Sequence, residues 1–276
     1  MFFDVSLAEW SLHNALQGGS LNHLDFPVVA RSEFGLDAVE YVNQFFTSTT
    51  SGYLAQLKHR CEDHGVRSLL IMCDHEGELA SSQRSTRMEA VESHYKWIDA
   101  AHYLGCHSIR VNCFGDGTKE GLMAAAAESL RKLAEFANPA GINIIVENHG
   151  GHTSDAKWLV SLMQSVAMTN VGTLPDFGNF CTRREQGDMW HSPCLEWYDR
   201  YQGVAELLPF AKGVSAKGME FGSDGECIET DYSRMLPIVH AAGYRGYLGI
   251  EYEGPVLAER DGIRAIHALL RRYGDI

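Results

Sequence analysis

The chain has few basic residues, no closely spaced cysteine pair and no long apolar run, and each absence excludes a class of protein. Its 23 Lys and Arg residues are outnumbered by 36 Asp and Glu residues, which gives a formal net charge of −13 with histidine neutral. An acidic surface repels phosphate backbones, so nucleic acid is not an expected partner. No apolar run approaches the roughly 20 residues of a membrane-spanning helix, so no membrane partner is expected either.

The cysteines give no sign of a disulfide framework. There are seven of them, an odd number, and no two are spaced as C-x-x-C. A chain of 276 residues buries a core large enough to need no covalent cross-links. The first residues, Met1 to Asp4, also lack the basic start of a signal peptide. We therefore expect reduced thiols and a cytoplasmic location.

Short β-rich runs alternate along the chain with longer segments whose apolar residues recur at three- and four-residue spacing. This alternation predicts parallel strands joined by helices, and its repetition over this length predicts a (β/α)8 TIM barrel. We expect one domain over residues 1–276. The predicted strands are Phe2–Leu7, Ala38–Val42, Val66–Cys73, Ser108–Cys113, Asn143–Glu147, Val171–Asp176, Gly213–Lys217 and Tyr247–Glu251. The clearest predicted helices are Arg87–Leu104, Gly121–Phe136, Asp155–Val166, Tyr232–Ala242 and Arg260–Arg272.

Two less regular segments interrupt this alternation. They are Ser11–Leu36, after the first predicted strand, and Asn179–Glu196, after the sixth. Neither has the composition of a linker, and both occur where a barrel carries the loops of its active site. We expect them to form such loops.

Three carboxylates occupy corresponding places at the carboxyl ends of predicted strands. Glu147, Asp176 and Glu251 each follow a run of apolar or small residues in the fifth, sixth and eighth strands. The chemistry of a TIM barrel gathers at that end. Burying such charges without a partner is very costly, so a cation must meet them. Converging oxygen ligands suit Mn²⁺ or Mg²⁺, while Zn²⁺ and Co²⁺ are also compatible with them.

The structural alternative is that these carboxylates cap helices or form ion pairs. Arg110, Arg183 and Lys217 are the cations that the sequence offers for such pairs. For any one carboxylate this alternative is the simpler explanation. Recurrence of the same feature in three of four successive strands favours a metal site.

Several motifs resemble the xylose isomerase-like TIM-barrel superfamily, in its branch of sugar phosphate isomerases and epimerases. Glu147, Asp176 and Glu251 lie in three of these motifs, and the resemblance extends over essentially the whole chain. In that superfamily a divalent metal is held by Glu, Asp, His and Glu, which by position implies Glu147, Asp176, residue 215 and Glu251. Residue 215 is serine here, so the identity of the fourth ligand stays open. The motifs are Ser6–Leu12, Ile145–Gly151, Pro175–Asn179, Val214–Lys217 and Gly249–Gly254.

The resemblance implies a metal-dependent isomerase or epimerase that moves a proton next to a carbonyl of a keto-sugar or related polyol. Glu147 and Glu251 would flank the substrate, one removing the proton and the other returning it. The metal would stabilise the enediolate formed between the two steps. The expected partner is then a small-molecule sugar or polyol. Barrels of this kind often associate, so a homo-oligomer is a further expectation.

Five other residues are candidates for the same site. Lys217 and His149 are candidate catalytic residues, because each lies two positions from another inward-facing candidate and shares its face of the strand. Trp10 offers an apolar face to a sugar ring, Asn112 offers hydrogen bonds to hydroxyls, and Arg183 offers a guanidinium to an anionic group. Three of them also have a structural alternative: an ion pair for Lys217, rim packing for Trp10 and a turn cap for Asn112. No glycine-rich phosphate cradle follows the seventh or eighth strand, so a phosphorylated substrate is not inferred.

Three other functions stay open at this point. A lyase or dehydratase acting on a keto-sugar or keto-inositol would begin with the same proton abstraction. A non-catalytic sugar-binding barrel is compatible with the serine at position 215. A relative of the apurinic endonucleases is disfavoured, because those enzymes hold several zinc ions with many histidines at strand ends, and the net charge here opposes DNA binding.

Overall fold

The eight predicted strands form one curled parallel sheet in the computed structural model, which describes all residues 1–276. Neighbouring strands follow the order β6-β5-β4-β3-β2-β1-β10-β9. Each of these eight strands lies at the place of a predicted strand. Their bounds are β1 (Asp4–Ala8), β2 (Ala38–Val42), β3 (Arg67–Met72), β4 (Ser108–Val111), β5 (Asn143–Glu147), β6 (Val171–Leu174), β9 (Val214–Gly218) and β10 (Tyr247–Tyr252).

Backbone hydrogen bonds between the two ends of this sheet close it into a barrel. Ser215 N donates to Pro175 O over 2.9 Å, and Phe177 N donates to Ser215 O over 3.1 Å. Lys212 N donates to Thr173 O over 3.0 Å nearer the other end of β6. Together these bonds join β9 and the residues before it to β6 and the residues after it. The predicted (β/α)8 barrel is therefore confirmed.

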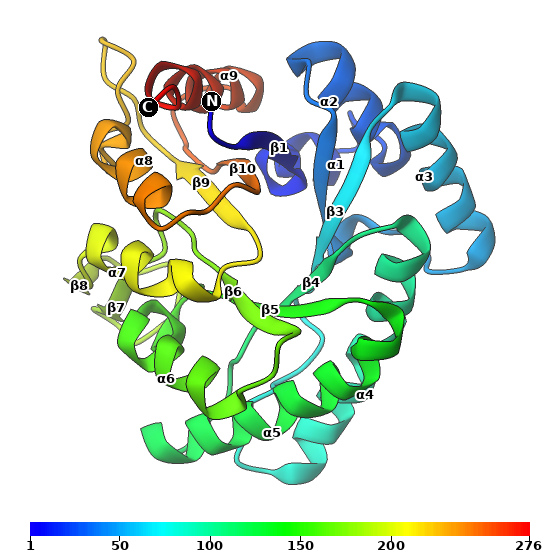
Figure 1. Ribbon diagram of the computed structural model, residues 1–276, viewed down its shortest axis with the longest axis vertical. Coiled ribbons are helices and arrows are strands. Elements are labelled where there is room, and N and C mark those ends of the chain that lie inside the picture. The colour runs from blue at the N-terminus through cyan, green and yellow to red at the C-terminus, as the bar shows by residue number, and fades with distance from the viewer.

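Helices surround the strands on the outside of the barrel (Figure 1). The five predicted helices are all present, with ends that differ by at most three residues from the prediction. None of the helices combines the length and apolar character that crossing a bilayer requires. The bounds are α1 (His13–Gln17), α2 (Phe26–Phe34), α3 (Ser51–His64), α4 (Arg84–Leu104), α5 (Lys119–Ala137), α6 (Ala156–Val166), α7 (Arg200–Leu207), α8 (Tyr232–Ala241) and α9 (Glu259–Tyr273).

The hydrophobic core has two parts. The larger part, of 67 buried residues, fills the space between the strands and the helices. The smaller part has six buried residues: Ala8, Val42, Leu70, Met72, Ile145 and Leu174. All six lie in barrel strands, so they form a compact apolar layer of the sheet. Charged and polar side chains from the same strands are also buried, and they supply the functional site described below.

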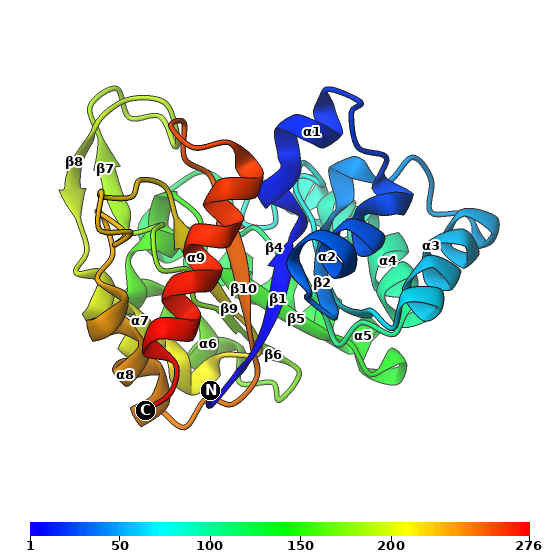
Figure 2. The same cartoon turned by 90° about the horizontal axis from the view of Figure 1, so that it is seen from above.

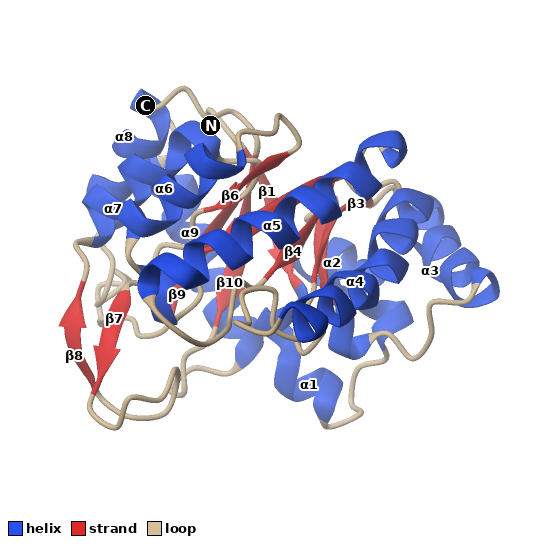
Figure 3. Cartoon of the chain, turned by 90° about the horizontal axis from the view of Figure 1, so that it is seen from below, coloured by secondary structure: helices blue, strands red, loops and turns tan.

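The segment after β6 contains a two-stranded antiparallel hairpin made of β7 (Cys181–Arg184) and β8 (Cys194–Trp197). It projects at the end of the barrel that also carries α1, which is opposite the end where the two termini lie (Figure 2). Figure 3 shows the hairpin standing apart from the ring of helices. This segment was expected to form an active-site loop, and the structure refines that loop to a hairpin at the carboxyl end of the strands.

A disulfide joins Cys181 in β7 to Cys194 in β8, whose Cα atoms are 5.9 Å apart. The expectation that all seven thiols are reduced is therefore wrong for this pair. The pairing of β7 with β8 brings together two cysteines that are 13 positions apart in sequence, and no hairpin was predicted there. The other five cysteines are free and buried, as small core residues are expected to be.

Candidate active site

The barrel opens at its carboxyl end into a cavity of about 950 Å³. Residues that follow most of the barrel strands line it, among them Trp10 after β1, Asp74 after β3, Asn112 after β4 and His149 after β5. The β7–β8 hairpin forms part of its wall. A cavity in this position is where a TIM barrel places its ligand.

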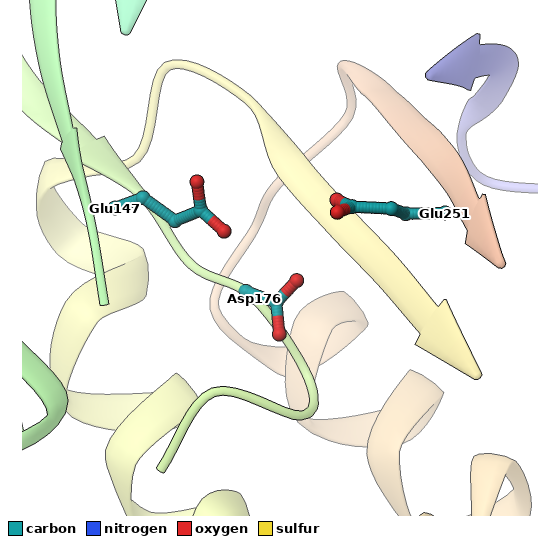
Figure 4. Close-up of side chains that lie close together, drawn as sticks. All are labelled: Glu147, Asp176 and Glu251. Carbon is teal, nitrogen blue, oxygen red and sulfur yellow. The ribbon is translucent and has the colours of Figure 1, made fainter. Parts of the chain in front are cut away.

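Three carboxylates, carried by β5, β10 and the segment after β6, lie close together (Figure 4). Glu147 ends β5, Asp176 follows β6 and Glu251 lies in β10, and one oxygen of each lies within 4.8 Å of the others. All three side chains are buried. Only Glu251 lines the cavity itself, whereas Glu147 and Asp176 lie below its floor. The cluster is therefore a buried acidic site with one member facing the ligand space.

Each of the two deeper carboxylates has one oxygen engaged and one left without a hydrogen bond. Glu147 Oε1 accepts from Asn179 Nδ2 over 3.1 Å, and Asp176 Oδ1 accepts from the backbone N–H groups of Gly178 and Asn179 over 2.6 and 2.9 Å. Glu147 Oε2 and Asp176 Oδ2 are buried and accept no hydrogen bond, and each has only an ion-pair contact, with Arg110 Nε at 3.0 Å and with Lys217 Nζ at 3.9 Å. Buried polar atoms are rarely left in that state. Their donor set of hard oxygens fits a divalent cation such as Mn²⁺ or Mg²⁺.

Ser215 stands where the resemblance implied a histidine ligand. Its hydroxyl donates to Glu251 Oε2 over 2.8 Å in a fully buried contact. The serine thus orients one of the carboxylates. A neutral hydroxyl in that bond is a poor substitute for an imidazole as a metal ligand.

Two cations contact the acidic cluster. Lys217 Nζ lies 2.7 Å from Glu253 Oε2, 3.4 Å from Glu251 Oε1 and 3.9 Å from Asp176 Oδ2. Arg110 lies 3.0 Å from Glu147 Oε2 through Nε, and 2.6 Å from Asp74 Oδ1 through a terminal nitrogen. The ion pairs with Arg110 and Lys217 that formed the structural alternative are therefore present. Five carboxylates still face two cations, so negative charge remains in excess when all of them are ionised.

The charges of these groups follow from their surroundings. Burial raises the pKa of Glu147 well above its usual value, and Arg110 only partly offsets this effect. Burial also raises the pKa of Glu251, against the opposing attraction of Lys217. For Lys217, burial lowers the pKa, but Glu251, Glu253 and Asp176 outweigh burial and hold the pKa well above its usual value. Lys217 is therefore an ammonium, and additional positive charge would favour ionised carboxylates.

His149 is neutral and its tautomer is fixed by Asn112. Asn112 Nδ2 donates to Asp74 Oδ1 over 2.7 Å, so the amide oxygen of Asn112 faces His149 Nδ1 at 2.9 Å. His149 Nδ1 must therefore carry the proton, which leaves Nε2 as an acceptor. Burial lowers the pKa of His149 to about 3, and the charge of Arg110 adds to that effect.

Residues 28–273 match the family model described as the xylose isomerase-like TIM barrel. The match covers most of the chain. The chain belongs to the xylose isomerase-like TIM-barrel family.

Solved structures share the fold of this xylose isomerase-like barrel at low sequence identity. The IolI protein with a bound zinc atom superposes with a TM-score of 0.75 at 13% identity, covering 99% of this chain and 100% of that one. D-psicose 3-epimerase from Clostridium cellulolyticum H10, solved with D-tagatose, gives a TM-score of 0.68 at 13% identity, covering 99% and 98%. A sugar phosphate isomerase/epimerase from Parabacteroides distasonis gives 0.70 at 15% identity, covering 98% and 94%. No curated protein matches the sequence.

The structure places all but one of the predicted site residues of this xylose isomerase-like barrel in or directly beneath the cavity. Trp10 lines it and donates from Nε1 to Glu253 Oε1 over 2.5 Å. Arg183 does not line it; its exposed side chain forms an ion pair with Glu196 across the hairpin at 2.7 Å. The neighbouring Arg184 lines the cavity instead. An irregular register between β7 and β8 breaks the simple alternation of faces there.

Sequence reasoning did not assign Glu253 to the site, and it named Arg110 only as a possible ion-pair partner of the three carboxylates. Glu253 binds both Lys217 and Trp10, and Arg110 binds Glu147. Both had a signal in the sequence. Glu253 lies two residues after Glu251, and Arg110 lies two residues before Asn112, so the period of a strand places each pair on one face.

Proposed function

We propose that the protein is a metal-dependent isomerase or epimerase that moves a proton next to the carbonyl of a keto-sugar or related polyol. The observation that carries this proposal is the convergence of Glu147, Asp176 and Glu251 under a ligand-sized cavity, with two buried oxygens that accept no hydrogen bond. The solved neighbours named as sugar epimerases support the same reaction class. Mn²⁺ or Mg²⁺ is the preferred ion for these oxygen ligands.

In this proposal Glu147, Asp176 and Glu251 hold the divalent ion. When bound, the ion supplies positive charge that stabilises the oxygens of an enediolate. Glu251 lines the cavity and is the base with direct access to a substrate proton. Glu147 lies below the floor, where Arg110 and Asn179 separate it from the cavity that they line. The substrate must therefore reach past one of these two residues if Glu147 is to return the proton.

Lys217 and His149 complete the proposed chemistry. Lys217 is a permanent ammonium at the cavity floor, where it can donate to a substrate oxygen that gains negative charge. His149 offers Nε2 as a hydrogen-bond acceptor for a substrate hydroxyl. Trp10 and Asn112 bind the sugar at the sides of the cavity, and Arg183 has no role because it faces away from the cavity.

Proton exchange in D₂O tests this function. Purified protein loaded with Mn²⁺ is incubated with a panel of ketopentoses, ketohexoses and keto-inositols, and the products are followed by NMR and mass spectrometry. The proposal predicts deuterium at the carbon beside the carbonyl, without loss of water from the product. Glu78→Gln is the matched control for the variants Glu147→Gln and Glu251→Gln, because Glu78 is an exposed carboxylate that lines the same cavity.

Each other outcome identifies a different function. An unsaturated product would replace the isomerase with a lyase that shares the first step. Binding of a sugar without any exchange, unchanged in Glu147→Gln and Glu251→Gln, would identify a non-catalytic sugar-binding barrel.

A cytoplasmic location is part of the proposal. Five of the seven cysteines are free and buried, which is compatible with a reducing compartment. The Cys181–Cys194 bond lies in the projecting hairpin and contributes no link between the hairpin and the barrel core.

A further inference from the structure

Exposed apolar side chains are concentrated around the mouth of the cavity. Eight of the twelve large apolar side chains that are exposed lie in the segments after β6, β9 and β10. Four of these eight also line the cavity, and we call them the apolar rim: Met189, Trp190, Trp197 and Met219. Their exposed fractions are 38%, 41%, 56% and 39%. Apolar surface gathered at one place marks a binding site more often than scattered exposure does.

The apolar rim is held in place before any ligand arrives. The Trp190 ring lies 4.6 Å from the His149 ring and packs so closely on Gly150 that a Cβ there would lie 2.9 Å from it. The Arg200 guanidinium lies 5.7 Å from the centre of the Trp197 ring, and the disulfide ties the hairpin that carries both tryptophans. A surface ordered in advance loses little conformational entropy on binding.

The cavity is also large for a single sugar. Its volume of about 950 Å³ is near the upper end of the roughly 300–1,000 Å³ found for sites that take drug-sized ligands. The carboxylate floor and the apolar rim divide it into a polar part and an apolar part. A sugar ring on the floor leaves the rim unfilled.

No lysine or arginine is free at the rim to bind a phosphate. Arg110, Arg184 and Lys217 are the only Lys or Arg side chains that line the cavity. Arg110 and Lys217 pair with carboxylates, and Arg184 donates to the carbonyl oxygens of Met189 and Ser192 over 2.8 and 2.7 Å. A phosphate or another anionic group is therefore disfavoured at the rim.

We propose that the substrate is a keto-glycoside, whose carbonyl lies at a ring carbon other than the one that carries the aglycone. Its sugar binds the carboxylate floor, and its uncharged aromatic aglycone packs on the apolar rim. Indole rings present flat apolar faces for stacking, and methionine side chains adapt to aromatic edges. The position of the sugar rests on the proposed function. The aglycone subsite rests only on the apolar rim, so the two parts can be tested separately.

Calorimetric titration with matched glycoside pairs tests the subsite. Methyl and p-nitrophenyl glycosides of the same hexoses and pentoses are compared on wild-type protein, on Trp197→Ala and on Met219→Ala. We expect the p-nitrophenyl member of at least one pair to bind tenfold or more tightly than its methyl partner, and either variant to reduce that preference to below threefold. Tyr103→Ala is the matched control, because Tyr103 is an exposed aromatic in α4 that does not line the cavity, and it should keep the full preference.

The remaining outcomes overturn the subsite. Equal affinities within every pair, or no binding of any pair, would overturn it, and so would p-nitrophenol alone binding as tightly as the glycoside. If a second copy of the chain covers the rim instead, light scattering would show a dimer that Trp197→Ala dissociates. Calorimetry would then show no preference for the p-nitrophenyl glycosides. Deuterium exchange of a free keto-sugar would still support the proposed function in these cases, whereas an aglycone preference without exchange would support the subsite alone.

Discussion

Glu40 shows how a single buried acid shapes this barrel. Its carboxylate occupies the space that a side chain at residue 249 would fill, because a Cβ on Gly249 would lie 2.6 Å from both carboxylate oxygens. Ser6 donates to Oε1 over 2.6 Å, whereas Oε2 is buried without a partner. Burial raises the pKa of Glu40 to about 7, against the hydrogen bond from Ser6 and with a contribution from the charge of Glu251. The folded protein therefore holds this proton more tightly than the unfolded chain does.

This raised pKa predicts a stability change with pH that belongs to Glu40. The unfolded chain releases the proton near its ordinary pKa of 4.5, so the stability contributed by the bound proton is present below that pH and is lost as pH rises toward about 7. At about 1.4 kcal/mol per pKa unit, the loss is on the order of 3 kcal/mol. In Glu40→Gln this loss is absent. The free energy of unfolding of the variant minus that of wild type should rise by roughly 2–3 kcal/mol over this window.

Urea unfolding at a series of pH values measures this difference in the free energy of unfolding. Because both proteins contain the other titrating groups, the contributions of those groups cancel. Glu78→Gln, which changes an exposed carboxylate, should give a flat difference. A flat difference for Glu40→Gln as well would show that Glu40 titrates normally in the folded protein.

At the residue scale, the position in a strand determined what the sequence could reveal. Glu147, Asp176 and Glu251 were predictable as neighbours because the carboxyl ends of parallel strands meet at one end of a barrel. Two details depend on how Arg110 and Asn179 pack around Glu147 and Asp176: which carboxylate oxygens accept no hydrogen bond, and the position of both carboxylates below the floor. Nothing in a linear sequence specifies such side-chain conformations.

At the element scale, regular patterns were informative and the irregular segment was not. The eight barrel strands were predicted because each is an apolar run between helices with clear spacing. Gly65 and Gly105, both in the left-handed conformation, end α3 and α4. The hairpin β7–β8 has no clean alternation, and its register shifts twice within four residues of β7. Arg183 was therefore predicted to bind the substrate although it does not line the cavity, and the disulfide was missed.

The disulfide is expected to stabilise the hairpin locally. Cross-linking a loop of this size stabilises it by about 3 kcal/mol in the chain-entropy model. The double variant Cys181→Ser with Cys194→Ser should lose this effect. Because the hairpin stands outside the ring of helices, we expect thermolysin to cut residues 185–193 at least tenfold faster than in wild type, while the barrel stays intact.

Wild-type protein treated with dithiothreitol provides the matched comparison for that experiment. It should be cut at the rate of the double variant. Equal rates for oxidised, reduced and mutated protein would show that strand pairing alone holds the hairpin.

At the scale of the whole molecule, part of the acidic charge lies inside the barrel. The net charge of −13 includes five buried or half-buried carboxylates around one floor, with two cations among them. Excess negative charge in a desolvated site is costly unless a cation joins it. The same net charge is the basis of the expectation that nucleic acid is not a partner. The acidic interior is the central feature of the proposed function.

Calorimetric titration of metal-free protein with Mn²⁺ tests that feature most directly. The account predicts one ion per chain with a dissociation constant in the micromolar range or below. Glu147→Gln, Asp176→Asn or Glu251→Gln should each weaken the affinity for Mn²⁺ at least a hundredfold, and Glu78→Gln should leave that affinity unchanged. Circular dichroism confirms that each variant is folded. Wild-type protein that binds no Mn²⁺, Mg²⁺, Zn²⁺ or Co²⁺ at millimolar concentration would contradict the account, and would leave the carboxylates paired with Arg110 and Lys217 alone.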